Sequence, residues 1–267
     1  MNIRHLFTIL ILSLCFINVT LSPSFADDFG DDVIDANPAL EVEADYILDG
    51  EDDWESEEDV LVVNDPLREF NTAMFSFNDK VITYVFNPIS KVYDAVIPRV
   101  AQKSINNIFL NIAAPKRFFN KLFQLKPKPA GIVAGRFLIN STIGLGGMFD
   151  PAKAAFKLEK QSEDFGQTLG HYGMGEGFYL VVPIMGPTTG RDILGYVGDA
   201  VFSPLTWFTY TDVDPEDAWT IAKYVRRVNN YSYNVRDNYE RIVDDAFDPY
   251  TAIQHAYVQN RRKKIAD

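Results

Sequence analysis

Residues 65–85 read DPLREFNTAMFSFNDKVITYV, and this stretch sets the structural class of the chain. Its apolar residues recur at spacings of three and four, which is the period of one face of an α-helix. Asp is favoured at the N-cap of a helix and Pro at its first position, so Asp65-Pro66 predicts the start. Because the residue before a proline avoids the helical region, we expect this helix to end near Asn87-Pro88. The apolar positions are Leu67, Phe70, Met74, Phe77, Val81 and Val85.

The same Asp-Pro signal recurs further along the chain. Asp150-Pro151, Asp214-Pro215 and Asp248-Pro249 predict three more helix starts, and helical periodicity mostly follows them. The residues from Asp214 to Ala246 predict one long helix, for which Asp214 and Asp217 make a capping box. The last helix, from Pro249 to Arg262, ends in four cations, as suits a helix C-terminus. Strand signals are sparse, so the predicted fold class is mainly α.

A basic and aromatic segment runs from Pro98 to Leu125, with a break at Pro115. Beyond the proline, aromatic residues and cations are interleaved as in an amphipathic helix. Such a helix suits a membrane surface, and it also suits a helix that turns its apolar face to a protein core. From this segment alone we favour the core-facing interpretation. The residues concerned are Lys116, Arg117, Phe118, Phe119, Lys121, Leu122 and Phe123.

The middle of the chain is rich in glycine and differs from the helical segments. Residues 166–177 read GQTLGHYGMGEG, and the apolar run FYLVVPIM and the stretch GPTTGRD follow, up to residue 192. Pro183 argues against an ordinary central strand or helix, and the glycines indicate tight turns with positive φ. An exposed apolar loop is costly in water, so we expect protein or lipid to cover this one. We therefore predict a hairpin-like element that is central to function.

The first residues predict export. Residues 1–26 combine a basic start with an apolar stretch that is too short to span a bilayer. Ser24-Phe25-Ala26 then offers a cleavage site, so we expect a secretory signal peptide. The only cysteine, Cys15, lies inside it, which would leave the mature chain without a disulfide or a thiolate metal site. Leu14 precedes Cys15 where lipid attachment needs a small residue, so we do not expect a lipid anchor there.

The net charge of −12 hides two regions of opposite character. Residues 27–65 carry 17 acidic residues and no base, whereas residues 66–267 carry 20 acidic residues and 24 bases. We assign residues 27–63 to an acidic arm with too much charge to fold alone, and residues 64–267 to one helical domain. The mild positive charge of the domain suits either an anionic membrane surface or a near-neutral soluble protein.

The motifs of catalysis are lacking, so we expect no enzyme, no cofactor and no metal site. Two histidines follow the predicted signal peptide, His171 and His255, and no His-x-x-x-His or Cys-x-x-Cys pair accompanies them. There is no Gly-x-Ser-x-Gly nucleophile motif, and the glycines of residues 173–177 lack the spacing of a nucleotide loop. For His171 we favour hydrogen bonding within a glycine-rich turn over a role as general base.

Two polar pairs are candidate site residues. Asn71 and Asn78 are seven residues apart and so share one helix face, where they suit either a water-lined channel or a buried hydrogen-bond network. Arg191 and Asp192 suit either a polar path or a helix cap with a surface ion pair. The residues alone leave both choices open.

Taken in order, these segments resemble the MlaA/VacJ family. Each block is modest, but the ordered set is specific, and it covers about residues 64–262. The matching stretches are residues 64–71 (NDPLREFN) with Met74, Phe77 and Asn78, residues 136–140 (RFLIN) with 144–150, residues 165–173 (FGQTLGHYG), Pro183, Gly186, Arg191-Asp192, residues 248–250 (DPY) and Ala256-Tyr257.

The resemblance implies a ring of amphipathic helices embedded in the inner leaflet of the outer membrane of a Gram-negative bacterium, on its periplasmic side, with a glycine-rich central hairpin. Such a protein would remove mislocalised phospholipids from the outer leaflet through an amphipathic channel and so maintain lipid asymmetry. It would pass them to a soluble periplasmic lipid carrier of the MlaC kind. Family members also associate with outer-membrane porin trimers. No bond is broken in this retrograde transport, so the missing catalytic motifs are expected.

The same resemblance implies roles for particular residues. The loop from Gly173 to Gly190 would be a gating hairpin. Residues of the first helix and the Arg-Asp pair would line the lipid path. The gating residues are Gly173, Gly175, Gly177, Pro183 and Gly186, and the path residues are Phe70, Asn71, Asn78, Arg191 and Asp192.

Two features depart from the family pattern. Many members are anchored by a lipidated N-terminal cysteine, which we do not expect here, and the acidic arm is unlike a simple linker. Both leave the mode of anchoring open. The alternative function is an exported envelope or surface interaction protein without transport activity, and phospholipid that co-purifies with the domain would separate the two.

Overall fold

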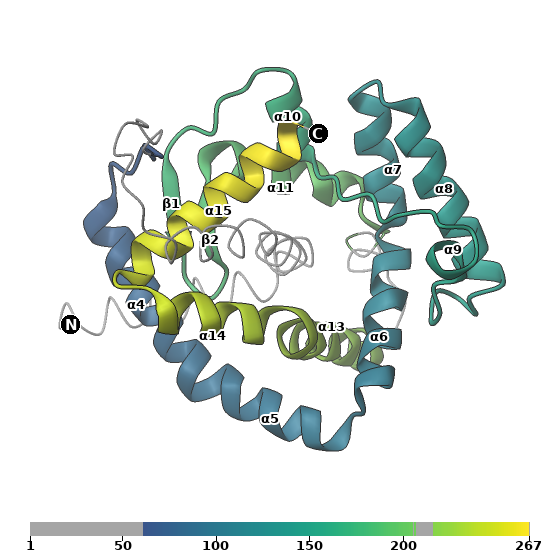
Figure 1. Ribbon diagram of the computed structural model, residues 1–267, viewed down its shortest axis with the longest axis horizontal. Helices are drawn as coiled ribbons and strands as arrows, with labels where there is room; N and C mark the ends of the chain where they lie inside the picture. Colours follow the sequence, from purple (N-terminus) through teal and green to yellow (C-terminus); the bar gives the residue numbers. More distant parts are fainter. Residues whose placement is uncertain (1–60, 205, 207–215, 267) are drawn as a thin grey trace, which may run out of the picture.

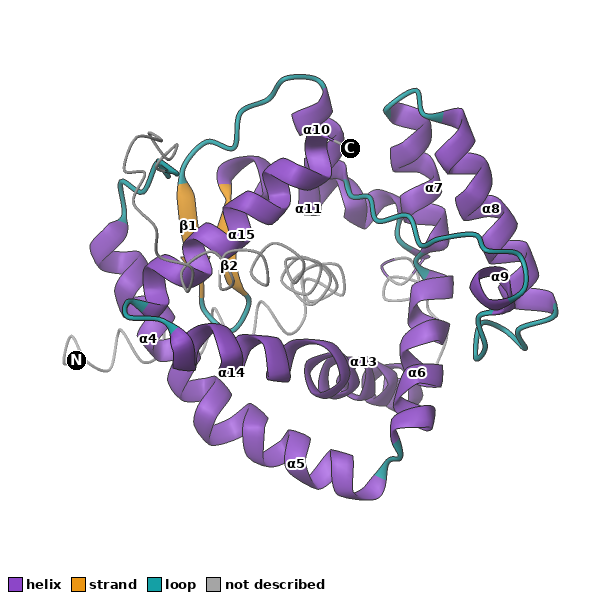
Figure 2. Ribbon diagram, in the orientation of Figure 1, coloured by secondary structure: helices purple, strands orange, loops and turns teal. Residues whose placement is uncertain are grey.

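Helices arranged in a ring dominate the computed structural model, as the sequence predicts (Figures 1 and 2). The structure describes residues 61–204, 206 and 216–266. The predicted signal peptide, residues 27–60 of the predicted acidic arm and the predicted capping box at Asp214 lie outside the described residues. The elements are α4 (Arg68–Val81), η1 (Ile82–Phe86), α5 (Asn87–Val96), α6 (Arg99–Ile112), α7 (Ala114–Phe123), α8 (Pro127–Thr142), α9 (Pro151–Ala154), α10 (Phe165–His171), β1 (Tyr179–Val182), β2 (Gly186–Thr189), α11 (Gly190–Phe202), α13 (Glu216–Asn230), η2 (Tyr231–Val235), α14 (Arg236–Asp245) and α15 (Pro249–Ala266).

The ring closes through contacts between elements that are far apart in the sequence. Helices α4, α5, α6 and α7 follow one another around it, and α7 then meets α10 and α11. Helix α11 leads back through β2 and β1 to α4, which β1 contacts. Helices α13, α14 and α15 lie along the ring, and α8 and α9 lie outside it beside α6 and α7 (Figure 1). Elements from the beginning, the middle and the end of the domain therefore contribute to one closed ring.

The first helix does not end at Asn87-Pro88, so that prediction was wrong. Asn87 is helical (φ −61°, ψ −48°), and the chain continues from α4 through the π-helical segment η1 into α5. In η1 the amide of Asn87 donates to the carbonyl of Ile82, five residues back. In this wider turn the ring of Pro88 avoids a clash with the preceding turn, and the hydrogen bond that its missing N–H would donate is not needed. The helical backbone therefore continues where a proline would break a regular α-helix.

The other Asp-Pro signals differ in how well they place a helix start. Helices α9 and α15 begin at Pro151 and Pro249, as predicted, and the Asp150 carboxylate caps α9 by accepting from the amide of Lys153. Helix α4 begins two residues later than predicted, because Asp65 does not cap it. The predicted long helix is present from Glu216 as α13, η2 and α14.

Apolar side chains form a core on one side of the ring, where α4, the hairpin, η2, α14 and α15 meet. Two clusters lie there, one between η2, α14 and α15 and the other between β1 and α15. Phe75 of α4 packs against both clusters and so joins them. The buried members are Tyr231, Val235, Tyr239, Ile242, Ile253 and Ala256 in the first, and Tyr179, Val181, Tyr250, Tyr257 and Val258 in the second.

On the opposite side of the ring, charged side chains are buried and apolar side chains are exposed, which is the reverse of the usual arrangement. On α7, Lys116 and Lys121 are buried, whereas Leu122 and Phe123 are 40% and 37% exposed. The expectation that α7 turns its apolar face to a core was therefore wrong. Helix α11 is similar, because it buries Arg191, Asp192 and Asp199. Its exposed face carries Leu194, Val197 and Val201.

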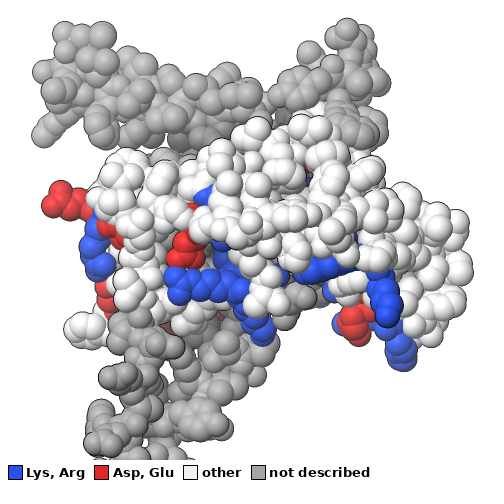
Figure 3. Space-filling model, turned by 90° about the horizontal axis from the view of Figure 1, so that it is seen from above, with Lys and Arg blue, Asp and Glu red and all other residues white. Residues whose placement is uncertain are grey.

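Charge is also unevenly distributed over the surface. Seen from above, Lys and Arg side chains lie in a band along one side of the described part, beside a broad surface of uncharged residues (Figure 3). Within residues 61–204, 206 and 216–266, every helix is too short or too polar to cross a bilayer.

Candidate functional site

The glycine-rich segment forms the predicted hairpin. Strands β1 and β2 pair antiparallel, with Tyr179 opposite Thr189 and Val182 opposite Gly186. Pro183, Ile184 and Met185 make the turn between them. Ile184 has a φ of 67°, which is strained for a β-branched residue and persists only where neighbouring contacts hold it.

Two asparagines of α4 hold β1. The Asn71 amide donates to the carbonyl of Tyr179 (3.1 Å) and accepts from the amide of Val181 (2.8 Å). Asn78 repeats this arrangement one step along, since it donates to the carbonyl of Val182 (2.9 Å) and accepts from the amide of Ile184 (2.6 Å). Each side chain thus satisfies the free edge of β1 as a neighbouring strand would. The second bond also holds the strained residue at the turn.

The described N-terminal residues lie against the same hairpin. The carbonyl of Asn64 accepts from the amide of Tyr179 (2.8 Å), and the side chain of Asn64 donates to the carbonyl of Gly177 (3.3 Å). Leu61 and Val63 pack against the apolar cluster behind β1. Residues 61–63, which we had assigned to the acidic arm, therefore contact the domain.

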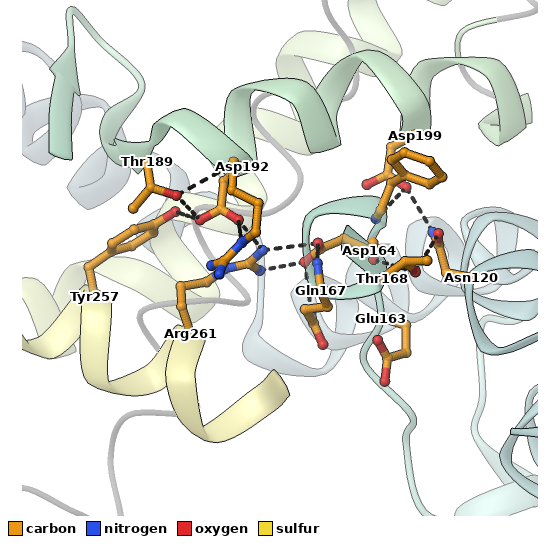
Figure 4. A network of polar contacts seen from close by, with 12 residues as sticks. Asn120, Glu163, Asp164, Gln167, Thr168, Thr189, Asp192, Asp199, Tyr257 and Arg261 are labelled. Atoms are coloured by element: carbon orange, nitrogen blue, oxygen red, sulfur yellow. Dashed lines mark hydrogen bonds and ion pairs between the residues drawn. The ribbon is translucent and has the colours of Figure 1, made fainter. Parts of the chain in front are cut away.

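Strand β2 is tied to a buried charged network at the start of α11 (Figure 4). The Thr189 hydroxyl caps α11 by accepting from the amide of Asp192 (3.3 Å), and it donates to the Asp192 carboxylate (2.8 Å). That carboxylate also accepts from the Tyr257 hydroxyl (2.7 Å) and from the Arg261 guanidinium (2.7 Å). Arg261 bridges further to both carboxylate oxygens of Asp164. The end of the hairpin is thereby connected to α10 and α15.

The network continues toward α7 through a second set of polar side chains. Asn120 donates to the Asp199 carboxylate (2.8 Å), and Lys116 lies 3.4 Å from the same group. Thr168 of α10 donates to Asn120 (3.1 Å). Nearby, Lys121 forms a buried ion pair with Glu163. Four cations and four carboxylates are buried along this side of the ring: Lys116, Lys121, Arg191 and Arg261 with Glu163, Asp164, Asp192 and Asp199.

Burial and charge shift the acidic groups in opposite directions. Burial alone would raise the pKa of Asp164, but the charge and hydrogen bonds of Arg261 outweigh it and hold that pKa well below its usual range. The same balance lowers the pKa of Asp192. For Asp199, burial dominates over the attraction of Lys116 and raises the pKa to about 6. Two carboxylates are therefore firmly ionised, and one is poised near neutrality.

Helices α10 and α11 cross at two glycines. A Cβ on Gly195 would stand 2.5 Å from the backbone nitrogen of Gly166, which no real contact tolerates. A Cβ on Gly166 would meet Asp192 and Arg261 at 2.6 and 2.7 Å. This close approach lets the network bridge three helices.

The predicted site residues fall into distinct settings. Asn71 and Asn78 are buried together against the hairpin, so they form a buried hydrogen-bond network. Phe70, on the same helix, is 46% exposed. Arg191 and Asp192 form a buried pair and not a surface pair, and Thr189 supplies the helix cap.

The predicted gating residues also differ among themselves. Gly173, Gly177 and Gly186 have positive φ, which the predicted tight turns require. Gly175 has an ordinary φ and open space where a Cβ would project. Pro183 begins the turn of the hairpin. His171 is exposed at the end of α10, with its ring edge-on to Tyr172.

Sequence reasoning missed the buried ions. Arg261 was interpreted as part of a charged helix end, and Lys116 and Lys121 as the polar side of α7. The available signal was the sequence spacing of Lys116, Asn120 and Gln124, which places three polar residues on one face of α7. In the described part of the chain, acidic and histidine residues form no cluster of three that could hold a metal ion.

Comparison with known proteins identifies the family that has this architecture. A family model described as MlaA lipoprotein matches residues 63–264. The intermembrane phospholipid transport system lipoprotein MlaA of Haemophilus influenzae is 35% identical over 207 residues, which are 76% of this chain and 80% of the relative. The protein of the same name in Escherichia coli K12 is 30% identical, over 73% of this chain and 76% of the relative.

A solved structure supports the same assignment. It comes from work on the structural basis for maintenance of bacterial outer membrane lipid asymmetry, and it matches with a TM-score of 0.65 and 29% identity. The match covers 76% of this chain and 99% of the other. In sequence and in fold, this chain belongs to the MlaA family.

Proposed function

We propose that this protein transports phospholipid and thereby maintains the lipid asymmetry of the outer membrane. It removes mislocalised phospholipids from the outer leaflet and passes them toward the periplasm. Support comes from the family, whose relatives in Haemophilus influenzae and Escherichia coli are named for intermembrane phospholipid transport. The observation that carries the proposal is a ring with buried charges on one side and apolar residues on its exposed surface.

In this proposal the ring lies in the inner leaflet of the outer membrane and does not cross it. Val92 and Val96 of α5 are 66% and 70% exposed, and Leu194 and Val197 of α11 are 54% and 64% exposed. Soluble monomers rarely expose so much apolar surface, whereas acyl chains cover it at no cost. Helices suit this position because they satisfy their own backbone hydrogen bonds. Residues 1–26 would act as the signal peptide for export.

The lipid path involves the residues that surround the hairpin. Phe70 offers an apolar surface beside the chain of the lipid, and Asn71 and Asn78 act by holding β1 in place. Asp192 positions Arg191, whose Nη2 atom is buried without a hydrogen-bond partner among the described residues. That donor is available to a phosphate or to water.

The hairpin acts as the gate of the path. Gly173, Gly177 and Gly186 supply turns that other residues strain, and Pro183 stiffens its tip. Gly175 has room for a side chain, so a bulky residue there would alter the gate and leave the fold intact. On the periplasmic side a soluble carrier of the MlaC kind takes the lipid, and a porin trimer serves as a membrane partner.

The test measures phospholipid on the cell surface. In a strain without this protein, an impermeant amine-reactive label should modify more phosphatidylethanolamine than in the wild type. Wild-type protein should restore low labelling, whereas Gly175→Trp and the double variant Asn71→Leu/Asn78→Leu should not. Ser76→Ala, an exposed position on the same helix, is the matched control and should behave as wild type.

The same experiment separates the alternative. If loss of the protein leaves surface labelling unchanged but weakens the envelope toward detergent, the protein is an envelope interaction protein without transport activity. Export of every variant is checked by its amount in the outer-membrane fraction.

A further inference from the structure

The two strands of the hairpin are held by buried contacts. Asn71 and Asn78 of α4 bond the free edge of β1. At the end of β2, Thr189 bonds the buried Asp192. Movement of the strands would break several of these bonds at once, and buried polar groups that lose their partners are costly. The segment before β1 is therefore the part of this element that can move at the lowest cost.

This segment is the approach loop, residues 173–177, which leads from α10 to β1 beside α15 (Figure 1). Met174 is 42% exposed, and the space where a Cβ would project is open at Gly173 and Gly175. Positive φ occurs at both ends of the loop, 87° at Gly173 and 74° at Gly177. Because glycine has the widest choice of backbone conformations, the approach loop can change its path without strain.

Two backbone carbonyls of the approach loop are bonded to the neighbouring parts of the chain. The carbonyl of Glu176 accepts from the amide of Arg191 at the start of α11 (3.2 Å). The carbonyl of Gly177 accepts from the side chain of Asn64 (3.3 Å). Since Arg191 belongs to the proposed lipid path, the approach loop contacts that path in the position described here.

A pair of side chains holds the approach loop against α15. The Arg262 guanidinium donates from Nη2 to Oε1 of Glu176 (2.6 Å) and from Nε to Oε2 (3.3 Å), so both carboxylate oxygens are bonded. Arg262 also donates to the carbonyl of Val62 (3.4 Å), which ties the same contact to the N-terminal segment. The side chains of Arg262 and Glu176 are 47% and 19% exposed, so water competes for the bonds. An exposed pair of this kind shifts a conformational equilibrium by about fivefold at most.

We propose that Glu176 and Arg262 are positioning residues that latch the approach loop, and that this loop, and not the two strands, is the moving part of the gate. A gate has to release its contacts at low cost, which an exposed ion pair permits and a buried one does not. Gly173 and Gly177 supply the hinges. The inference rests on the proposed function only in treating this element as a lipid gate, and the latch itself is tested without lipid transport.

The experiment measures hydrogen exchange at single-residue resolution on the full-length mature protein in a zwitterionic detergent, because exchange reports local opening. In Arg262→Met, the amide of Arg191 should exchange about fivefold faster than in the wild type, since its acceptor is the carbonyl of Glu176. The amides of Val181 and Ile184, which are bonded to the asparagines of α4, should keep their rates.

Two further variants separate a latch from a general effect of charge. The exchanged pair Glu176→Arg/Arg262→Glu should return the rate at Arg191 toward the wild-type value, because opposite charges face each other again. Lys263→Met, the matched control, removes a charge from the next exposed residue of α15 and should leave every rate unchanged.

An unchanged rate at Arg191 in Arg262→Met would overturn the latch. An equal rise at Val181 and Ile184 would also overturn it, since the pair would then stabilise the whole domain. Failure of the proposed function gives a different pattern: if surface phospholipid does not depend on this protein while Arg262→Met still opens the approach loop, the lipid gate is refuted and the latch is supported.

Discussion

The two sides of the ring are stabilised by different chemistry. Around β1, α4 and α15, buried tyrosine, valine and isoleucine side chains form an ordinary apolar core. Around α7, α10 and α11, the buried groups include many ions and amides, and several apolar residues of α7 and α11 are exposed, among them Leu122, Leu194 and Val197. The ring is therefore closed by apolar packing on one side and by buried polar contacts on the other.

Under the proposed function, the difference follows from what each side contacts. Where helices border lipid on their outer face, apolar residues gain no more from facing a neighbouring helix than from facing acyl chains. Polar contacts between the helices then determine which packing of the helices is favoured. Such networks are costly if one partner is lost, whereas an apolar core loses stability in proportion to the atoms removed.

The sharpest test removes one ion from the network. Arg261→Met should lower the free energy of unfolding by about 3–5 kcal/mol, because Asp164 and Asp192 would stay buried without their cation. Arg262→Met is the matched control: this neighbour forms an exposed pair with Glu176 and should change stability by less than about 1 kcal/mol. Denaturant unfolding in detergent measures both, and equal effects would mean that the network is not critical.

The apolar side should respond to lost volume. Ile253→Ala removes a side chain that is 3% exposed and should cost about 2–4 kcal/mol. Leu194→Ala removes a similar group from the exposed face of α11 and should have little effect in detergent. A large loss at Leu194 would show that this face is covered by protein.

Close approach of α10 and α11 gives an intermediate effect. Gly195→Ala forces a methyl group against the backbone of Gly166 and should cost about 1–3 kcal/mol, measured as a lower unfolding midpoint. Gly131→Ala, in open space on α8, should be neutral or stabilise by up to about 1 kcal/mol. A neutral Gly195→Ala would mean that the two helices can move apart freely.

The last effect is a pH dependence. The pKa of Asp199 is raised to about 6 in the folded state, so the folded state binds more protons than the unfolded state between about pH 4 and 6. Asp199 should thus add stability as the pH falls through 6, by roughly 3 kcal/mol at most, and Asp199→Asn should remove this gain. Below about pH 4 stability should fall, because the pKa values of Asp164 and Asp192 are lowered. Unfolding midpoints from pH 8 to 3 would check both trends.

Local signals in the sequence predicted local structure well. The Asp150 cap, the start of α15 at Pro249 and the seven-residue spacing of Asn71 and Asn78 each depend on neighbours within two turns. The continuation through Pro88 was not predictable, because it depends on a π-turn that has no sequence signature of its own. Helical content and the hairpin were therefore evident, but the path of the first helix was not.

The buried network could not be predicted in the same way. Arg261 meets Asp164 and Asp192 across 97 and 69 residues, so no local pattern connects them. The inverted face of α7 misled for a further reason: amphipathic periodicity shows that two faces differ, but not which one is buried. Only what surrounds each face in the folded protein decides that orientation.

The two π-helical segments determine where the chain can lose one residue without a change in the orientation of its helices. In η1 and η2, amides bond five residues back, at Ile82 and Tyr231, so each segment stores one residue more than an α-turn would hold. Deleting a single residue there would remove the stored residue and leave the helices on both sides in register, whereas the same deletion in a regular α-turn would rotate the helix beyond it by about 100°. A deletion in α4 between Asn71 and Asn78 would therefore turn one of them away from β1 although neither had been changed. A one-residue deletion in the two π-helical segments should accordingly alter the ring less than a deletion in the regular turns beside them.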